Sequence, residues 1–396
     1  MQANADLHIH GPHSTGSSPD MTIPLMDEYA GLKGLQILAT ADCLHPGWLK
    51  HLKGNLKEDN GLFRYKGSET RFLLETEVQD SSLVHQLIFL PSFDAADSLY
   101  SILKKHSTDI DINGRPRLSI GPEELAGIVL GEGGMIGPAH AFTPYYAIYS
   151  KFNSIKECYG KHASKIKFIE LGLSADTEMA DHIEELNHLT FLSNSDAHSV
   201  MRLGREFNRL ELEEYSFAAV KDAIDNHKVT LNAGYDPREG KYHLTACNKC
   251  YKQYALKDAR AKNMRCPCGG IIKTGVKDRI IARSGEKSRS PAFRPEYKHM
   301  IPLIEIISKS LGISSTYSKK VQELWRELVE DNGGEIKVLF EADLETIAEK
   351  NKNVSRAIKA FRDGKIEIHP GGGGNYGQIK LPFDPPKKQK SLSEFS

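Results

Sequence analysis

Short hydrophobic runs alternate with amphipathic stretches along the first 235 residues of the chain. The hydrophobic runs predict strands at 5–9, 35–39, 72–78, 84–90, 166–171 and 189–192. Apolar residues three and four positions apart predict helices near 23–31, 97–105, 122–129, 175–186 and 217–227. Strands that alternate with helices are typical of a mostly parallel sheet, closed or open. We therefore predict an α/β domain over residues 1–235, ended by a linker-like turn at 234–240.

The pattern changes towards the C-terminus. A segment rich in Ser, Arg and Pro at 285–295 is followed by apolar residues at helical spacing, namely Ile304, Ile307, Leu311, Val321, Leu324 and Leu328. A glycine run at 371–374 and a Lys/Pro-rich end come last. We predict a mainly helical domain over residues 295–380 and a flexible tail over 381–396.

Composition and charge narrow the class of protein. No apolar run approaches the roughly 18 residues of a membrane span, and the N-terminal MQANADLHIH has no secretory pattern, so we predict a cytoplasmic protein. The 52 basic and 52 acidic residues balance, but residues 241–300 hold 15 Lys and Arg against 4 Asp and Glu. A basic segment binds phosphates while an acidic remainder can bind cations, which favours a nucleoid-associated nuclease.

Histidines and carboxylates recur where the predicted strands end. His8 and His10 are two positions apart, so on a strand both rings point to one face and can share a divalent ion. Similar residues follow at Asp42, His45, Glu75, Glu77, His85, His140, Asp196 and His198. Because strand ends converge on one rim in such folds, we predict two or three divalent ions there, bridged by a carboxylate.

These residues, in this order, resemble the polymerase and histidinol phosphatase (PHP) superfamily. The resemblance covers about residues 1–235 and implies a distorted seven-stranded (β/α) barrel around a trinuclear metal site. The implied metal ligands are His8, His10, His45, Glu77, His85, His140, Asp196 and His198. The superfamily usually has Thr-Asp-His where this chain has Ala41-Asp42-Cys43, so His45, Asp42, Asp20 and His13 stay open as the ligand that completes the site.

Phosphodiester hydrolysis is the reaction that suits such a site. Paired cations activate a water molecule and stabilise charge on the phosphoryl oxygens. We expect Glu77 to be the bridging carboxylate and Asp196 to be a ligand that also orients the attacking hydroxide. Zinc, magnesium and manganese all remain open as the cation.

Four of the six cysteines form two close pairs, Cys247 with Cys250 and Cys266 with Cys268. Two pairs at this separation predict one structural zinc bound by four thiolates in a reducing compartment, rather than disulfides. Basic residues surround the pairs and are interleaved with tyrosines that can stack on bases. The side chains that we expect to bind DNA are Lys249, Lys252, Lys277 and Arg279.

Further motifs narrow the resemblance to the endonuclease Q family. The motifs are LGREFN at 203–208, the cysteine segment continuing into GVKDRI at 275–280, residues 297–308, and the late Tyr376-Gly377. That family implies a DNA-repair activity, the hydrolysis of the phosphodiester 5′ to uracil, hypoxanthine, xanthine or an abasic site. Such an enzyme must flip the damaged nucleotide into a pocket. The aromatic loop 142–146 either contributes to that pocket or packs the barrel rim.

The extreme C-terminus carries one more signal. Gln389, Leu392 and Phe395 fit the pattern Gln-x-x-aliphatic-x-x-aromatic, which resembles the peptide by which repair proteins bind a ring-shaped sliding clamp. We therefore predict a sliding clamp as a partner.

Three other classes compete with a repair nuclease. A PHP-type phosphatase of small phosphomonoesters would share the barrel but would not need the zinc segment or the basic excess. A non-catalytic binding module would keep the zinc segment but lose metal ligands, which are nearly complete here. A helicase-associated phosphoesterase, acting on another nucleic-acid substrate, also resembles the N-terminal two thirds.

Overall fold

The computed structural model of the protein describes residues 1–285 and 290–383. The chain falls into two compact units. The first contains Met1–Ala30, Leu35–Met300 and Pro370–Gly377, and the second contains Gly31–Gly34, Ile301–His369 and the described residues from Gln378 onward. The first unit thus includes both the predicted α/β domain and the cysteine segment.

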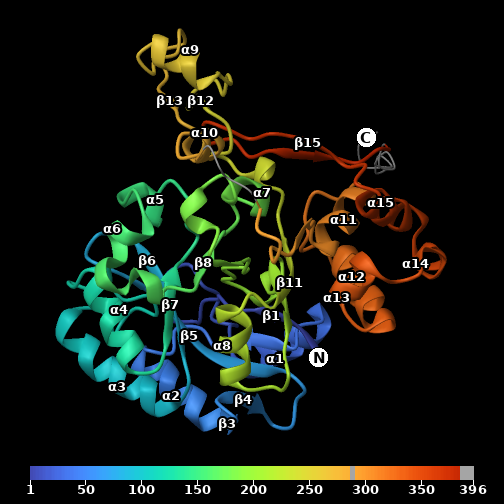
Figure 1. Ribbon diagram of the computed structural model, residues 1–396. Helices are drawn as coiled ribbons and strands as arrows, with labels where there is room; N and C mark the ends of the chain where they lie inside the picture. The colour runs from blue at the N-terminus through green and yellow to red at the C-terminus, as the bar shows by residue number, and fades with distance from the viewer. Residues whose placement is uncertain (286–289, 384–396) are drawn as a thin grey trace, which may run out of the picture. The chain divides into compact units, whose positions relative to one another are not determined.

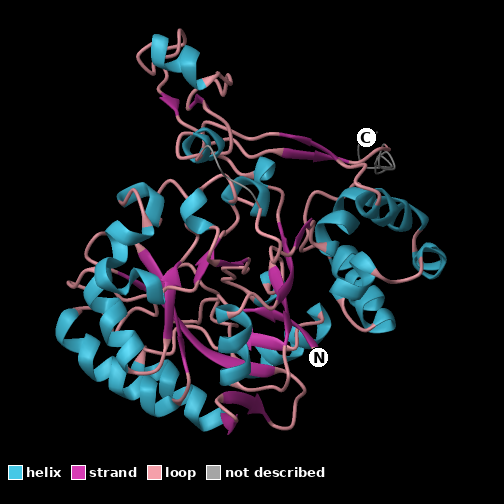
Figure 2. Cartoon of the chain, in the orientation of Figure 1, coloured by secondary structure: helices cyan, strands magenta, loops and turns pink. Residues whose placement is uncertain are grey.

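A ten-stranded sheet forms the centre of the first unit (Figures 1 and 2). Its order is β14-β11-β10-β1-β2-β5-β4-β3, with β6 paired to β5 and β7 paired to β6. The strands are β1 Gln2–Asp6, β2 Ile37–Ala39, β3 Leu56–Asp59, β4 Leu62–Tyr65, β5 Arg71–Gln79, β6 His85–Leu90, β7 Met135–Pro138, β10 Phe207–Glu211, β11 Val229–Gly234 and β14 Glu296–His299. A separate parallel pair joins β8 Phe168–Glu170 to β9 Thr190–Leu192.

Seven strands, β1, β2 and β5 to β9, form a closed ring. Between β7 and β8 the backbone N–H of Ala141 donates to the carbonyl of Glu170 (2.9 Å), and beyond β9 the N–H of His10 donates to the carbonyl of Ala197 (2.9 Å). The predicted α/β fold with a distorted seven-stranded barrel is confirmed. Its interior is apolar below the rim, with Leu73, Phe89 and Phe168 fully buried.

The expectation of a mostly parallel sheet is wrong. The pairs β1–β2, β2–β5 and β8–β9 are parallel, but β5–β6, β6–β7 and β1–β10 are antiparallel. Only the turn 80–84 connects β5 to β6, and in it Asp80 N donates to Val84 O (2.9 Å). A parallel pair would need a crossover of a dozen or more residues, so this turn enforces the antiparallel pairing.

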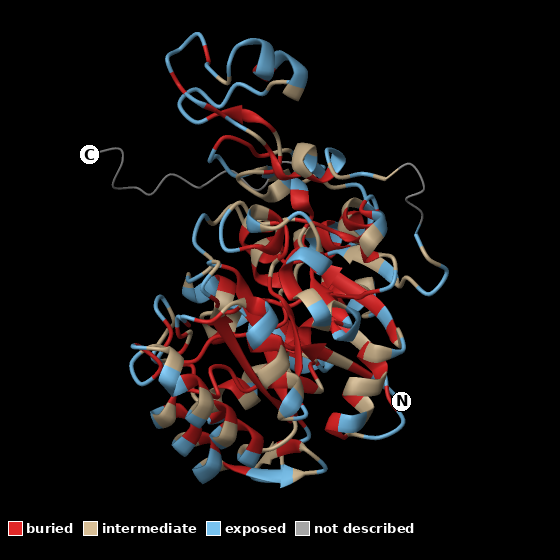
Figure 3. Ribbon diagram, turned by 60° about the vertical axis from the view of Figure 1, so that its left-hand side comes forward, coloured by how far each residue is buried: buried red, intermediate tan, exposed pale blue. Residues whose placement is uncertain are grey.

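Helices pack around the outside of the sheet, whose strands are the most buried part of the unit (Figures 2 and 3). They are α1 Ile23–Lys33, α2 Pro46–Asn55, α3 Phe93–Leu103, α4 Pro122–Gly131, α5 Ile148–Lys151, α6 Ile155–Tyr159, α7 Thr177–Ala180 and α8 Phe217–Asp225. The helix predicted at 175–186 is instead the short α7 and a separate 3₁₀ turn, Glu184–Leu186. Helix α2 and the hairpin β3–β4 were not predicted.

The cysteine segment has a small fold of its own within the first unit. Strands β12 Ala246–Cys247 and β13 Ile272–Lys273 pair antiparallel, and the helices α9 Leu256–Ala261 and α10 Val276–Ile281 flank β13. Around the cysteines its hydrophobic cluster consists of Cys247, Ala259, Cys266 and Ile272, with Tyr254 and Met264 partly buried against it. So small a core is typical of domains that a metal stabilises.

The second unit is mainly helical, as predicted. Its elements are α11 Leu303–Ser310, α12 Lys319–Asn332, α13 Glu335–Phe340, α14 Leu344–Lys350, α15 Lys352–Arg362, β15 Glu367–His369 and β16 Gln378–Lys380. Helix α12 ends because Gly333 adopts a left-handed φ of 70°, which favours glycine. The buried Glu335 carboxylate accepts from Trp325 Nε1 (2.7 Å) and Leu303 N (3.0 Å). No helix in the described parts of either unit is long and apolar enough to cross a membrane.

Candidate active site

Histidines and carboxylates from five strand ends meet at one rim of the barrel. His8 and His10 follow β1, Glu77 lies in β5, and His85 begins β6. His140 follows β7, and Asp196 and His198 follow β9. Two of these residues have a left-handed backbone, His140 with φ 28° and Asp196 with φ 46°. Such a conformation is unusual outside glycine and is held here by hydrogen bonds from His140 N to Glu170 and from Asp196 N to His8 O.

The ligand atoms form three overlapping groups, within each of which they lie no more than 4.8 Å apart. The groups are His8, His10 and Glu77; His10, Asp196 and His198; and Glu77, His85 and His140. Glu77 and His10 each belong to two groups. A shared carboxylate between imidazole groups is the arrangement that binds neighbouring divalent ions.

Glu77 is fully buried at the centre of these groups. Its Oε1 lies 2.9 Å from His85 Nδ1 and 2.8 Å from His140 Nε2, and its Oε2 lies 3.4 Å from His10 Nε2. Burial by itself raises the pKa of Glu77, but the positive charge of His85 and the hydrogen bonds from both histidines hold that pKa well below its usual range. Glu77 is therefore an anionic carboxylate.

Several buried ligand atoms have no hydrogen-bond partner. They are Nε2 of His8, Nε2 of His10 and Oδ1 of Asp196, the last two of which lie 3.1 Å apart as an ion pair without hydrogen-bond geometry. Burial lowers the pKa of His10, but the adjacent carboxylates of Asp196 and Asp42 raise it to about 10. A buried polar atom without a partner is costly, and clustered imidazole nitrogens and carboxylate oxygens are the atoms that a divalent ion would pair. The donor set therefore fits divalent metal ions.

A second layer of carboxylates orients the histidines. Glu170 Oε1 and Oε2 each lie 3.0 Å from His8 Nδ1 and together accept from His140 N (2.8 Å) and Asn194 Nδ2 (2.8 Å). Asp42 Oδ1 accepts from His10 Nδ1 (3.2 Å). Nδ1–H donation fixes the tautomer that leaves Nε2 free for a metal. Glu170 was not predicted, although it lies one position before the end of the predicted strand 166–171 and so is close to a strand end, as the candidate ligands are.

A row of buried asparagines supports Glu170. Asn194 Oδ1 accepts from Leu7 N (3.0 Å) and Asn208 Nδ2 (2.8 Å), and Asn208 Oδ1 accepts from Asn232 Nδ2 (2.9 Å). All three asparagines are fully buried. The row connects the loop after β9 to β10 and β11, so the orientation of Glu170 depends on the sheet itself.

His45 is not part of the three groups. Its Nδ1 accepts from Trp48 N (3.2 Å) at the start of α2, and its ring stacks on His13 with centroids 3.9 Å apart. Asp20 is exposed and bonds Ser18. Of the four residues left open by the sequence, only Asp42 contacts a residue of the groups, as an acceptor for His10.

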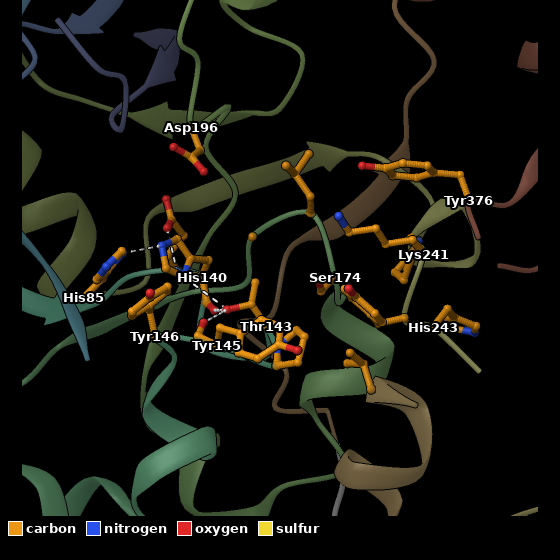
Figure 4. Close-up of a pocket in the computed structure, with 18 of the residues that line it drawn as sticks. His85, His140, Thr143, Tyr145, Tyr146, Ser174, Asp196, Lys241, His243 and Tyr376 are labelled. Atoms are coloured by element: carbon orange, nitrogen blue, oxygen red, sulfur yellow. Dashed lines mark hydrogen bonds between the residues drawn. The ribbon is translucent and has the colours of Figure 1, made fainter. Parts of the chain in front are cut away.

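A cavity of about 430 Å³ adjoins the metal-ligand groups (Figure 4). His85, His140 and Asp196 line its inner end. Tyr145 and Tyr146 line it close to His85 and His140, and Lys241, Tyr242 and Tyr376 also contribute to its lining. Of the aromatic loop, Tyr145 and Tyr146 line the cavity, whereas Phe142 is buried and stacks on Tyr149 at 5.5 Å between centroids. Tyr145 and Tyr146 therefore stay candidates for the nucleotide pocket, whereas Phe142 has a packing role.

The four cysteines of the basic segment lie together. Their sulfurs are within 4.8 Å of one another, with Cys247 and Cys268 3.5 Å apart and Cys250 and Cys266 3.6 Å apart. Sulfurs of a tetrahedral zinc site with Zn–S of about 2.3 Å would be about 3.8 Å apart. A hydrogen bond from Tyr254 lowers the pKa of the Cys266 thiol to about 6, which favours the thiolate. The cluster fits the predicted zinc site.

The barrel and its rim define a metal-dependent phosphoesterase, a hydrolase. The crystal structure of the lesion-specific endonuclease PfuEndoQ from Pyrococcus furiosus is 43% identical, covers 100% of both chains and superposes with a TM-score of 0.91. A crystal structure of endonuclease Q in complex with a 27-mer duplex substrate, with an abasic lesion at the active site, is 44% identical with a TM-score of 0.89, over 96% of this chain and 97% of that chain. The chain belongs to the endonuclease Q family.

Two curated relatives are also similar to the chain. The uncharacterized protein YqxK from Bacillus subtilis is 33% identical over 402 residues, which cover 95% of this chain and 98% of that protein. The uncharacterized protein MJ0043 from Methanocaldococcus jannaschii is 48% identical over 256 residues, and the match takes in 63% of this chain but only 32% of MJ0043. The family model of the MJ0043 C-terminal domain matches residues 302–365, within the helical second unit.

Proposed function

We propose that the protein is a metal-dependent DNA-repair endonuclease that hydrolyses the phosphodiester 5′ to a deaminated base or an abasic site. The deaminated bases would be uracil, hypoxanthine and xanthine. The observation that carries the proposal is the cavity that opens directly onto the metal-ligand groups, in a chain whose relative is known in complex with an abasic duplex. A flipped nucleotide in this cavity would bring its 5′ phosphate to the rim.

The residues at the rim would have different roles in hydrolysis. His8, His10, Glu77, His85, His140, Asp196 and His198 would hold two or three divalent cations, zinc, magnesium or manganese. Such cations, when bound, supply a hydroxide at neutral pH and neutralise phosphoryl oxygens. Asp196, which lines the cavity, would orient that hydroxide, and Glu77, which belongs to two of the groups, would be the bridging carboxylate.

The cavity has the chemistry that a single extruded nucleotide requires. Tyr146 stacks on His85 with centroids 4.7 Å apart and interplanar angle 12°, so it offers an aromatic face beside the ligands. Lys241 lies over the rings of Tyr242 and Tyr376, at 5.4 Å and 5.5 Å from their centroids. Aromatic faces bind bases without strong preference and a lysine binds phosphate, which suits several different lesions.

The zinc segment would hold the duplex beside the cavity. One structural zinc would join Cys247, Cys250, Cys266 and Cys268. Lys249, Lys252 and Lys277 are exposed and Arg279 is half-buried, so these side chains are free to reach phosphates. Replacing any one of these basic side chains by a neutral one should weaken DNA binding for all base sequences and reduce the salt dependence of that binding.

The test is an incision assay on end-labelled duplexes, each with one uracil, hypoxanthine, xanthine or abasic site, under magnesium, manganese or zinc. We expect one cut 5′ to the lesion for the wild type and none for Asp196→Asn. The matched control is Asp20→Asn, which changes an exposed carboxylate outside the ligand groups and should cut normally. Release of phosphate from a small phosphomonoester without any incision would favour the phosphatase alternative instead.

A sliding clamp is the protein partner that we propose, with a cytoplasmic, nucleoid-associated location. The motif residues Gln389, Leu392 and Phe395 lie outside the described residues, so the proposal rests on the sequence pattern. Leu392→Ala with Phe395→Ala should abolish binding to a purified clamp in calorimetry while incision without the clamp stays at the wild-type rate. Clamp binding by the double variant would contradict the proposal.

A further inference from the structure

A loop that the sequence did not single out brings an arginine to the metal-ligand groups. Arg115 Nη1 lies 3.1 Å from Glu77 Oε2 and donates a hydrogen bond to it. The Arg115 side chain is 30% exposed and lines the cavity together with His85, His140 and Asp196. We infer that Arg115 is a catalytic residue that donates to a non-bridging oxygen of the scissile phosphate. This inference rests on the proposed function.

The backbone around Arg115 is fixed from several sides. Gly114 N donates to His13 O (3.1 Å), and a Cβ at Gly114 would lie 2.2 Å from Asp42 Oδ2 and 2.5 Å from Ser14 Oγ. On the other side, Gln79 N donates to Pro116 O (2.9 Å) at the end of β5. The loop is therefore fastened to the strand that carries Glu77, and the guanidinium is positioned before any substrate binds.

The neighbouring arginine makes a contrast. Arg117 is directed to Asp109, which accepts from its Nε (2.8 Å) and from its backbone N (2.9 Å). The side chain of Arg117 is 70% exposed, and Arg117 does not line the cavity. Arg117 thus holds the loop, whereas Arg115 faces the reacting groups.

The bond between Arg115 and Glu77 leaves the arginine with unused donors. A guanidinium has five N–H donors in a planar fork, and Nη1 provides the contact to Glu77. A phosphate at the cavity's inner end would meet the remaining donors, and the fork matches two oxygens of a phosphate. Fixed donors of this kind stabilise the charge that develops in the transition state without reorganisation.

The competing explanation is that Arg115 only neutralises Glu77. In that case its loss would act through the cations that Glu77 holds, and bound metal would fall. If Arg115 contacts the phosphate, replacing Arg115 leaves the amount of bound metal unchanged. The loss of DNA binding and of incision then depends on the charge of that phosphate. Metal content and phosphate charge therefore separate the two explanations.

The experiment compares the wild type, Arg115→Ala and Arg115→Lys, with Arg64→Gln as the control. Arg64, on β4, donates a hydrogen bond to Ser68 O and lies outside the cavity lining. On an abasic duplex, single-turnover incision by Arg115→Ala should fall on the order of 100-fold, the usual effect of removing one such donor. Arg115→Lys should retain part of the rate, free guanidinium ion should partly restore Arg115→Ala, and metal per protein should stay constant in all variants.

A binding measurement supplies a readout without turnover. In the Asp196→Asn background, duplexes with either a normal phosphate or a neutral methylphosphonate 5′ to the lesion are compared. With Arg115 present the normal phosphate should bind more tightly, and Arg115→Ala should remove that preference. Incision by Arg115→Ala at the wild-type rate, or a loss explained by lower metal content, would overturn the inference. Absence of incision by the wild type would instead refute the proposed function.

Discussion

Replacement of Glu170 by glutamine removes one charge and keeps the shape of the side chain. The three groups around this buried carboxylate, His8 Nδ1, His140 N and Asn194 Nδ2, are all donors when His8 uses Nε2 for a metal. Glutamine brings an NH₂ group of its own, so at least one pair of donors must face each other. We expect Glu170→Gln to weaken metal binding without unfolding the barrel.

The size of the effect follows from what His8 can do. A buried donor left without an acceptor costs about 1–3 kcal/mol. His8 can avoid this cost by accepting at Nδ1, but its proton then moves to Nε2 and the ligand atom is lost. Burial lowers the pKa of His8, but the charge of Glu170 raises it well above its usual value. The neutral glutamine therefore also removes the largest of the effects that raise the pKa of His8. Replacing a residue that orients a metal ligand typically lowers metal affinity about 10- to 100-fold. This loss agrees with the free-energy cost of the unpaired donor.

Metal binding to Glu170→Gln is measured by calorimetric titration of metal-free protein, with thermal unfolding followed by circular dichroism. Glu185→Gln is the matched control, because the Glu185 carboxylate likewise accepts hydrogen bonds, from Tyr149 Oη (2.7 Å) and Ile155 N (3.0 Å), but does not contact the ligand groups. A metal affinity of Glu170→Gln within about twofold of the wild type, with both proteins folded, would refute the role given to Glu170.

Three further predictions concern other parts of the chain. Cys266→Ser should abolish zinc binding by the cysteine segment. After cobalt substitution this variant should lack the thiolate-to-cobalt absorption band. A retained band would show that three cysteines suffice. Burial lowers the pKa of His299, but its hydrogen bond to Asp176 and the charges of Asp236 and Asp176 raise that pKa above its usual value. The folded-state pKa therefore exceeds the unfolded one, so the stability that His299 contributes should be complete below about pH 6.5 and be lost as the pH rises through the folded-state pKa. Urea unfolding of wild type and His299→Asn at several pH values checks this, and a gap that widens with rising pH would contradict it. Phe168→Ala removes a fully buried ring that stacks on a second phenylalanine, with ring centroids 5.2 Å apart. The free energy of unfolding, measured by urea titration, should fall by about 3–5 kcal/mol. A fall below about 1 kcal/mol would mean that neighbouring side chains repack into the cavity.

The histidine and cysteine clusters could be predicted from the sequence because their signals are local. His8 and His10 share a face by strand periodicity alone, and Cys247 and Cys250 have the short spacing that metal sites use. The hydrophobic runs likewise located the strands that carry Glu77, His85 and Glu170, since a buried strand needs a nearly continuous apolar stretch. Strand direction was not local information, and the antiparallel pairing of β5 with β6 was missed.

The sequence by itself determined which residue types were available for metal and phosphate chemistry and roughly which strands present them. Only the tertiary structure decided which of them meet: it left His45 at the start of α2, and it brought Glu170 and Arg115 to the ligands. The physical reason is separation along the chain. Arg115 and Glu77 are 38 positions apart and Glu170 and His8 are 162 apart, so neither pair has a periodicity or spacing that a sequence can reveal. Such contacts exist only once the barrel closes and fixes its loops above one rim.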